Sequence, residues 1–184
     1  MLTDNRKINT SRGVRNNNPM NLVKGLPWAY RVNNPNEKRF LTFEKTWQGI
    51  RAGVLDITTD ISNGKNTLTL LMKEYAPKFE NDTTAYIGRL SKSLKIGEND
   101  ILNRKDENFM IKLVKSIIEV ENGKEAAKFV TEDDIKEGVN SAFIYRKYKL
   151  PENVKKVSTG KEKGLISVFV GIGAVLFLAK LLIK

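Results

Sequence analysis

The apolar run near the C-terminus constrains this chain of 184 residues more than any other feature. Residues 164–183 read GLISVFVGIGAVLFLAKLLI, in which Lys180 is the one charged side chain. About 20 apolar residues at a helical rise of ~1.5 Å give about 30 Å, the thickness of a bilayer's hydrocarbon core. Lys180 lies near the end of the run, where its stem can reach the interface. The sequence therefore predicts one transmembrane helix at residues 164–183.

The remaining chain divides into a domain and a linker. Residues 151–163 combine Pro, Gly, Ser and Thr with several lysines, which is typical of an exposed basic linker. Those lysines would lie beside the membrane and contact anionic head groups. Residues 1–150 hold the working domain. Hydrophobic residues make up 40% of the chain and charged residues 29%, a balance that permits a sizeable core.

Helical periodicity and capping residues predict that this domain is mainly α. Residues 12–43 are rich in Asn, Pro and Gly and are expected to form loops, with short extended pieces at 39–43. The expected helices span residues 47–61, residues 67–75, a stretch from Asn81 or Asp82 through Tyr86 and Leu90, residues 106–121 and residues 132–147.

The chain contains no cysteine and no histidine. Disulfides, thiol nucleophiles, Ser-His-Asp triads and the usual zinc ligands are therefore excluded. Any catalysis must rest on carboxylates, Lys, Tyr, Ser or Thr, and neither a metal nor a cofactor is expected.

The formal net charge is +11, which suits nucleic acid, an anionic membrane surface or an anionic polymer such as a bacterial wall. The basic residues are scattered and match no nucleic-acid-binding module, so nucleic acid is not an expected partner. A solvated basic surface explains the charge equally well.

Glu121 extends the apolar stripe of the helix expected at residues 106–121. Burial and the negative end of the helix dipole both favour its protonated form, which a general acid for glycosidic cleavage needs. A Glu that reaches solvent because the helix ends at Asn122 and Gly123 explains the same pattern. The stripe recurs at three- and four-residue spacing and consists of Met110, Leu113, Val114, Ile117 and Ile118.

Two other carboxylates compete with Glu121 for this role. Glu44 follows a short apolar stretch and precedes Trp47. Glu80 lies just ahead of an expected helix, where a carboxylate suits a charge stabiliser or a cap better than an acid. Several aromatic residues are candidates for sugar stacking, although packing in the core is the commoner role of an aromatic. They are Trp28, Tyr30, Trp47, Tyr75 and Tyr86.

Four motifs in one order carry a family resemblance. Residues 12–22 read RGVRNNNPMNL and are followed by FEKTWQGIRA at 43–52, YAPKFENDTTAYI at 75–87 and IIEVENG at 117–123. They resemble a phage family of virion-associated, lysozyme-like peptidoglycan-degrading proteins described as lytic transglycosylases. Its hallmark is Arg-Gly-Ile-Arg-Asn-Asn-Asn-Pro-Gly-Asn-Ile. Here Met20 replaces a Gly, which would be strained if that position needs a positive φ. Lys78 replaces a Pro.

The resemblance implies a lysozyme-like fold in residues 1–150, with a circularly permuted order that would bring Asn18 and Asn21 near Glu121. It implies cleavage of peptidoglycan glycan strands during phage entry, with Glu121 as the acid. A hydrolase needs a second carboxylate, for which Glu80 is available, whereas a transglycosylase lets a substrate hydroxyl close a ring. One strong candidate therefore favours the transglycosylase. The expected substrate-binding residues are Asn18, Asn21, Trp28, Trp47, Thr83 and Tyr86.

The N-terminus has no apolar run of signal-peptide length, so arrival with a phage particle is expected instead of export. The expected location is the virion membrane of a membrane-containing bacteriophage, anchored by residues 164–183, with the host cell membrane as the alternative. The expected partners are glycan strands, a lipid bilayer and capsid or vertex proteins. Alternative functions are a non-catalytic virion membrane protein that binds cell wall or capsid, and a late host-lysis protein.

Overall fold

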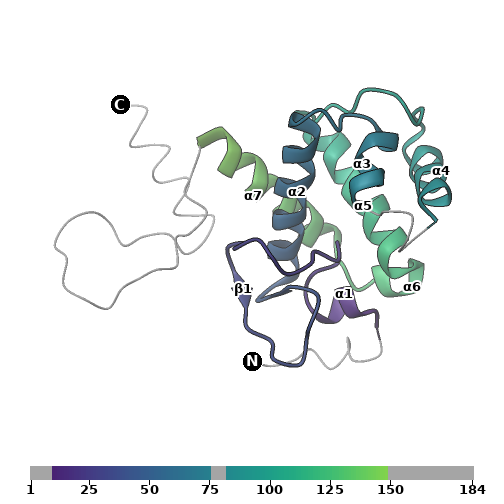
Figure 1. The fold of residues 1–184 in the computed structure, drawn as a ribbon. Helices are drawn as coiled ribbons and strands as arrows, with labels where there is room; N and C mark the ends of the chain where they lie inside the picture. The colour runs from purple at the N-terminus through teal and green to yellow at the C-terminus, as the bar shows by residue number, and fades with distance from the viewer. Residues whose placement is uncertain (1–9, 76–81, 149–184) are drawn as a thin grey trace, which may run out of the picture.

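The computed structural model describes residues 10–75 and 82–148, which form a mainly helical domain with one small sheet (Figure 1). The expectation of a mainly α domain is confirmed. The helices are α1 (Arg12–Arg15), α2 (Thr46–Ser62), α3 (Leu68–Tyr75), α4 (Thr83–Leu94), α5 (Glu107–Asn122), α6 (Lys124–Ala127) and α7 (Glu132–Tyr148), and the strands are β1 (Arg31–Val32) and β2 (Thr42–Phe43).

The prediction of a membrane-spanning helix is not supported, and the fold class is corrected accordingly. Across residues 10–75 and 82–148, no helix is both long and apolar enough to cross a bilayer. The two longest helices there, α2 and α7, have 17 residues each and carry charged side chains along their length. The expected anchor at 164–183 and the expected linker at 151–163 lie outside the described residues.

The core lies where α2, α5 and α7 pack together. In Figure 1, α2 stands between α7 on one side and α5 on the other; α4 packs against α5, and α3 contacts α4 and α2. Burying each large apolar side chain contributes roughly 1.5–3 kcal/mol. The apolar stripe predicted for α5 is confirmed, because Met110, Leu113, Val114, Ile117 and Ile118 are all at most 1% exposed.

The asparagine loop, residues 16–22, packs directly against α2 because α2 presents glycines to it. A Cβ atom at Gly49 would lie 2.1 Å from the carbonyl oxygen of Asn17, and one at Gly53 would lie 2.3 Å from the sulfur of Met20. Met20 has no positive φ. The left-handed positions of the loop are Asn17 (φ 52°) and Asn21 (φ 53°), and asparagine tolerates this conformation better than most residues. The strain considered for Met20 is therefore absent.

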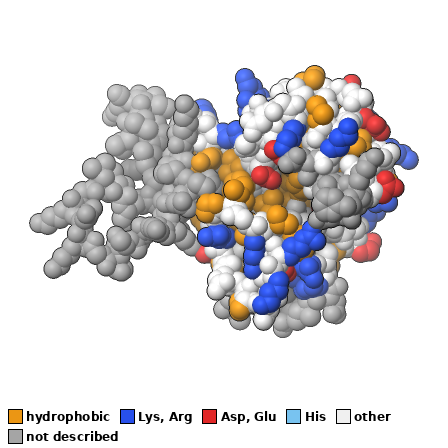
Figure 2. Space-filling view, viewed as in Figure 1, with side chains coloured by type: hydrophobic (Ala, Val, Ile, Leu, Met, Phe, Trp, Pro, Cys, Tyr) orange, Lys and Arg blue, Asp and Glu red, His pale blue; other side chains and the backbone are white. Residues whose placement is uncertain are grey.

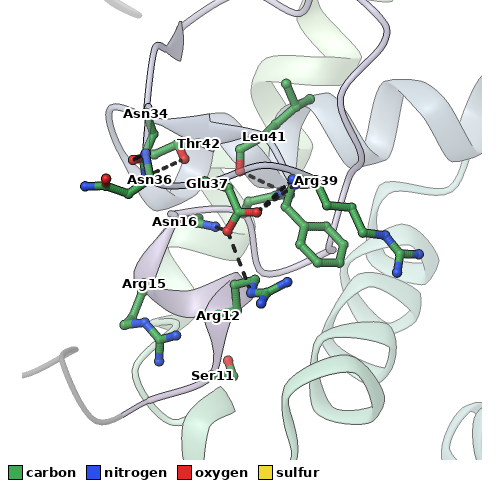
Figure 3. Close-up of polar contacts among 12 residues, drawn as sticks. Ser11, Arg12, Arg15, Asn16, Asn34, Asn36, Glu37, Arg39, Leu41 and Thr42 are labelled. Atoms are coloured by element: carbon green, nitrogen blue, oxygen red, sulfur yellow. Dashed lines mark hydrogen bonds and ion pairs between the residues drawn. The ribbon is translucent and has the colours of Figure 1, made fainter.

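The sheet loop, residues 33–41 between β1 and β2, contains a buried carboxylate, Glu37. The sequence pattern did not single it out. Glu37 accepts hydrogen bonds from the side-chain amide of Asn16 (3.0 Å) and from the backbone N–H groups of Arg39 (3.0 Å) and Phe40 (3.1 Å) (Figure 3). Its carboxylate also lies 3.7 Å from the guanidinium of Arg12. Burial acts to raise the pKa of Glu37, but these hydrogen bonds and the charge of Arg12 outweigh it and lower the pKa to about 2. Glu37 thus holds the sheet loop against α1.

Replacing Glu37 with Gln is expected to cost about 2 kcal/mol of stability at neutral pH, since hydrogen bonds to a charged group are lost. The folded-state pKa of Glu37 is lowered to about 2 from 4.5. Its contribution is therefore fully present above about pH 4.5 and is lost as the pH falls towards about 2. Thermal unfolding from pH 7 to pH 2.5 measures this, and Glu37→Gln should flatten the profile.

Glu125→Gln is the matched control for Glu37→Gln. The Glu125 side chain is 85% exposed and pairs with Lys128 at the surface. Its replacement should change stability by at most about 0.5 kcal/mol. A Glu37→Gln profile that follows the wild-type profile throughout this pH range would contradict the assigned role.

Candidate active site

Glu121 lies in the last turn of α5, is partly exposed, and has a hydrogen-bond donor at each carboxylate oxygen. The side-chain amide of Asn21 donates to Oε2 at 2.7 Å, and the Tyr86 hydroxyl donates to Oε1 at 2.9 Å. The expected proximity of Asn21 to Glu121 is present. Three segments far apart in sequence, namely the asparagine loop, α4 and α5, therefore meet at one carboxylate.

The next residue along α5 ties the helix end to the asparagine loop. The Asn122 amide donates to the carbonyl oxygens of Pro19 (2.7 Å) and Ile118 (2.9 Å) and accepts from the Ser11 hydroxyl (2.6 Å). A Cβ atom at Gly13 would lie 2.5 Å from the Asn21 side-chain oxygen and 2.7 Å from that of Asn122. The packing around Gly13 and Asn122 thus positions Asn21 before any substrate arrives.

Two tyrosine hydroxyls donate hydrogen bonds at this site, one to the asparagine loop and one to Glu121. The Tyr75 hydroxyl donates to the carbonyl oxygen of Met20. Burial raises the pKa of Tyr75 well above its usual value, and the negative charges of Glu121 and Asp56 raise it further. Burial likewise raises the pKa of Tyr86, with contributions from Tyr75 and from Glu121. Both hydroxyls therefore keep their protons across the physiological pH range.

Asp56 is a second acidic group whose charge acts on Tyr75, and the sequence pattern did not single it out. It lies on α2 and is partly exposed. Its position follows Gly49 and Gly53 at helical spacing, so it shares the face that packs on the asparagine loop. Its charge is close enough to Tyr75 to raise the pKa of that hydroxyl. In sequence Asp56 looks like any polar residue of an amphipathic helix.

The arrangement suits proton transfer by one carboxyl group. The Asn21 amide and the Tyr86 hydroxyl make charge-assisted hydrogen bonds to Glu121 when it is ionised. When Glu121 is protonated, the Tyr86 hydroxyl can rotate and accept, because a phenol is both donor and acceptor. Among the described residues, no group of three or more acidic side chains could hold a metal ion.

Three of the expected substrate-binding residues are buried, namely Asn18, Thr83 and Tyr86, of which Tyr86 is 5% exposed and has its hydroxyl on Glu121. Asn18 is 0% exposed, and its amide donates to the carbonyl oxygens of Leu22 (2.9 Å) and Leu41 (3.0 Å). Its side-chain oxygen accepts from the Leu22 N–H at 3.0 Å. Thr83 is 2% exposed at the first residue of α4. Asn18 and Thr83 offer almost no surface to a substrate, and Asn18 instead holds the asparagine loop closed.

The other expected residues are distributed around the fold. Trp28 is partly buried and packs against both apolar clusters of the domain. Trp47 is partly exposed beside Tyr30. Glu44 is exposed, and its backbone carbonyl accepts from the Asn17 amide at 3.2 Å. Glu80 lies outside the described residues.

Comparison with known proteins places the chain among bacteriophage proteins. It is 31% identical over 138 residues to Protein P5 of Pseudoalteromonas phage PM2, which covers 72% of this chain and 82% of that protein. The chain belongs to the P5 family of phage PM2. No protein-family model matches it. An aligned stretch of that share, wherever it begins, includes Tyr86 and Glu121.

Proposed function

We propose that this phage protein is a virion-associated lytic transglycosylase that cleaves the glycan strands of peptidoglycan with Glu121 as its acid and base. The observation that carries the proposal is the partly exposed Glu121 carboxylate held between the Asn21 amide and the Tyr86 hydroxyl. Membership of a phage family supports the virion setting. A basic chain of net charge +11 also suits an anionic wall polymer.

The proposed reaction uses Glu121 twice. Protonated Glu121 gives its proton to the glycosidic oxygen as the bond from that oxygen to the anomeric carbon breaks. A hydroxyl of the same sugar then bonds to the anomeric carbon and closes a ring, and its proton returns to Glu121. Asn21 and Tyr86 stabilise the carboxylate between these steps, when their hydrogen bonds are charge-assisted. The proposed reaction consumes neither water nor a cofactor.

Fragment analysis tests the proposal directly. Purified peptidoglycan is incubated with the full chain, and the released fragments are analysed by mass spectrometry. Anhydro ends support the transglycosylase, and reducing ends would assign hydrolysis instead. If no fragment appears, but the protein sediments with the wall, a non-catalytic wall-binding role replaces the enzyme. Immunoblotting of purified particles tests the virion setting, and absence from particles would support a late lysis protein.

Tyr86→Phe is expected to slow wall cleavage about 10- to 100-fold. This factor corresponds to the loss of one hydrogen bond in the transition state that contributes about 1.5–3 kcal/mol. Only the hydroxyl that donates to Glu121 is removed. The free energy of unfolding should therefore change by at most about 1 kcal/mol. Initial rates on purified wall and urea denaturation of the same preparations measure the two effects.

Asn18→Ala is the matched contrast in the asparagine loop. It removes three buried hydrogen bonds, so it should cost about 3 kcal/mol of stability. Because Asn18 holds the loop that carries Asn21, any loss of wall cleavage in this variant should accompany its loss of stability, whereas Tyr86→Phe should lose rate alone. If Tyr86→Phe instead loses stability and keeps its rate, Tyr86 is a structural residue and not part of the site.

A further inference from the structure

A row of aromatic side chains lies near the other end of the asparagine loop from Glu121. The row consists of Trp47, Tyr30 and Tyr145, all of which are partly exposed. The rings of Tyr30 and Trp47 have centroids 5.5 Å apart and are tilted by 60°. The row combines the turn just before β1, the first turn of α2 and the last part of α7, so only the tertiary fold assembles it.

Arg51 joins the three segments of the row from beneath. It is 6% exposed, and its guanidinium carbon lies 5.8 Å from the centroid of the Tyr30 ring and 4.9 Å from that of Tyr145. Cation–π attraction to both rings restrains their orientation. The rings are therefore held in place before a ligand arrives, which reduces the entropy that binding must overcome.

The backbone of Tyr30 is in an uncommon conformation. Its φ is 63°, in the left-handed region that bulky residues rarely adopt. Its carbonyl oxygen accepts from the Glu44 N–H at 3.3 Å. Conformations of this kind persist where the surrounding structure enforces them, and they are frequent at ligand-binding sites. Here the conformation places the Tyr30 ring against Trp47 and Arg51.

The row is connected to the candidate active site through the asparagine loop. The Thr46 hydroxyl, next to Trp47 in the chain, donates to the Asn17 side-chain oxygen at 3.1 Å. Asn21, which holds Glu121, follows Asn17 by four residues and therefore lies at most about 14 Å away. Hydrophobic side chains gather on the face in Figure 2, over the region of α2 and α7, with Lys and Arg side chains around them.

We propose that the aromatic row binds a further stretch of the glycan strand, away from the bond that is cleaved, so that long strands are preferred over short oligosaccharides. This inference rests on the proposed function. Sugar rings have an apolar face and a rim of hydroxyls, and the amphipathic rings of Tyr and Trp match both. Binding energy from remote parts of a substrate is realised in the cleavage step, so its loss lowers kcat/KM for long strands.

Two variants test the row, and both are measured on long glycan strands and on short soluble chito-oligosaccharides. Tyr145→Ala removes one ring. Tyr30→Asn removes another and retains a residue that tolerates the positive φ. We expect kcat/KM on long strands to fall at least about 10-fold in each variant, with kcat/KM on short substrates within about 2-fold of wild type. Phe129→Ala is the control, because Phe129 is an exposed aromatic (40%) outside the row.

The experiments distinguish an error in the proposed aromatic subsite from an error in the proposed catalytic role of Glu121. If both variants lose the same activity on long and short substrates, or keep wild-type rates on long strands, the row is not a subsite. Co-sedimentation with insoluble peptidoglycan in a Glu121→Gln background measures binding without cleavage. If the wild-type protein cleaves nothing, but Tyr145→Ala or Tyr30→Asn weakens its co-sedimentation with peptidoglycan, the binding role of the row is supported and the catalytic proposal is wrong. A chain that neither cleaves nor sediments overturns both.

Discussion

Replacing Glu121 with Gln is expected to lower the rate of wall cleavage by about 10²- to 10⁴-fold, the usual contribution of a general acid and base. The Gln side chain keeps the shape of the carboxyl group. Its oxygen can accept from Asn21 while its amide donates to the Tyr86 hydroxyl, so the contacts around α5 are preserved. Turbidity loss of purified peptidoglycan measures the rate, and circular dichroism checks the fold.

Glu119→Gln is the matched control for this experiment. Glu119 lies on the same helix, two residues before Glu121, and its side chain is outside the contacts with Asn21 and Tyr86. It should retain wild-type activity and stability. Undiminished wall cleavage by Glu121→Gln would remove Glu121 from the mechanism and leave Glu44 and Glu80 as the carboxyl candidates.

Replacing Gly49 with Ala is expected to destabilise the domain by about 3 kcal/mol, at the upper end of the usual cost of overpacking. The new methyl group would lie 2.1 Å from the carbonyl oxygen of Asn17, which is backbone and cannot rotate away. The asparagine loop would have to move from α2, and the Asn21 contact with Glu121 would move with it. Urea denaturation should show the loss of stability, and wall cleavage should fall in the molecules that stay folded.

Gly88→Ala, in another helix of the same domain, is expected to have the opposite effect on stability. Gly88 lies within α4, and a Cβ atom there would meet nothing within 4 Å. Ala is favoured over Gly in a helix interior, so this variant should gain up to about 1 kcal/mol. Equal stability of the Gly49 and Gly88 variants would mean that the asparagine loop is not held by close contact with α2.

Asp56 is a candidate for the second carboxylate that a hydrolase would need. The sequence offered one strong carboxylate candidate, which favoured ring closure by the substrate. Asp56 now adds an acidic group whose charge reaches Tyr75 beside the site. Reducing ends among the fragments would assign hydrolysis and make Asp56 the first residue to test as the second carboxylate.

Helical periodicity by itself determined the elements that build the core. Apolar residues at three- and four-residue spacing predicted a helix at 106–121, which the structure places at Glu107–Asn122, and they predicted which face is buried. The cap expected at Asn81 or Asp82 is formed by Asp82, whose side chain accepts from the Ala85 N–H. Such features depend on residues within one or two turns of each other, so local sequence is enough to specify them.

The tertiary structure decided what Asn18 and Glu37 do. Asn18 and Asn21 are the same residue type three positions apart, yet one is fully buried and the other donates to Glu121. Glu37 stands among polar residues and looks solvated in sequence, but the return of the chain past α1 buries it against Asn16 and Arg12. These roles depend on partners far along the chain, up to 100 residues away for Asn21 and Glu121, which no local pattern encodes.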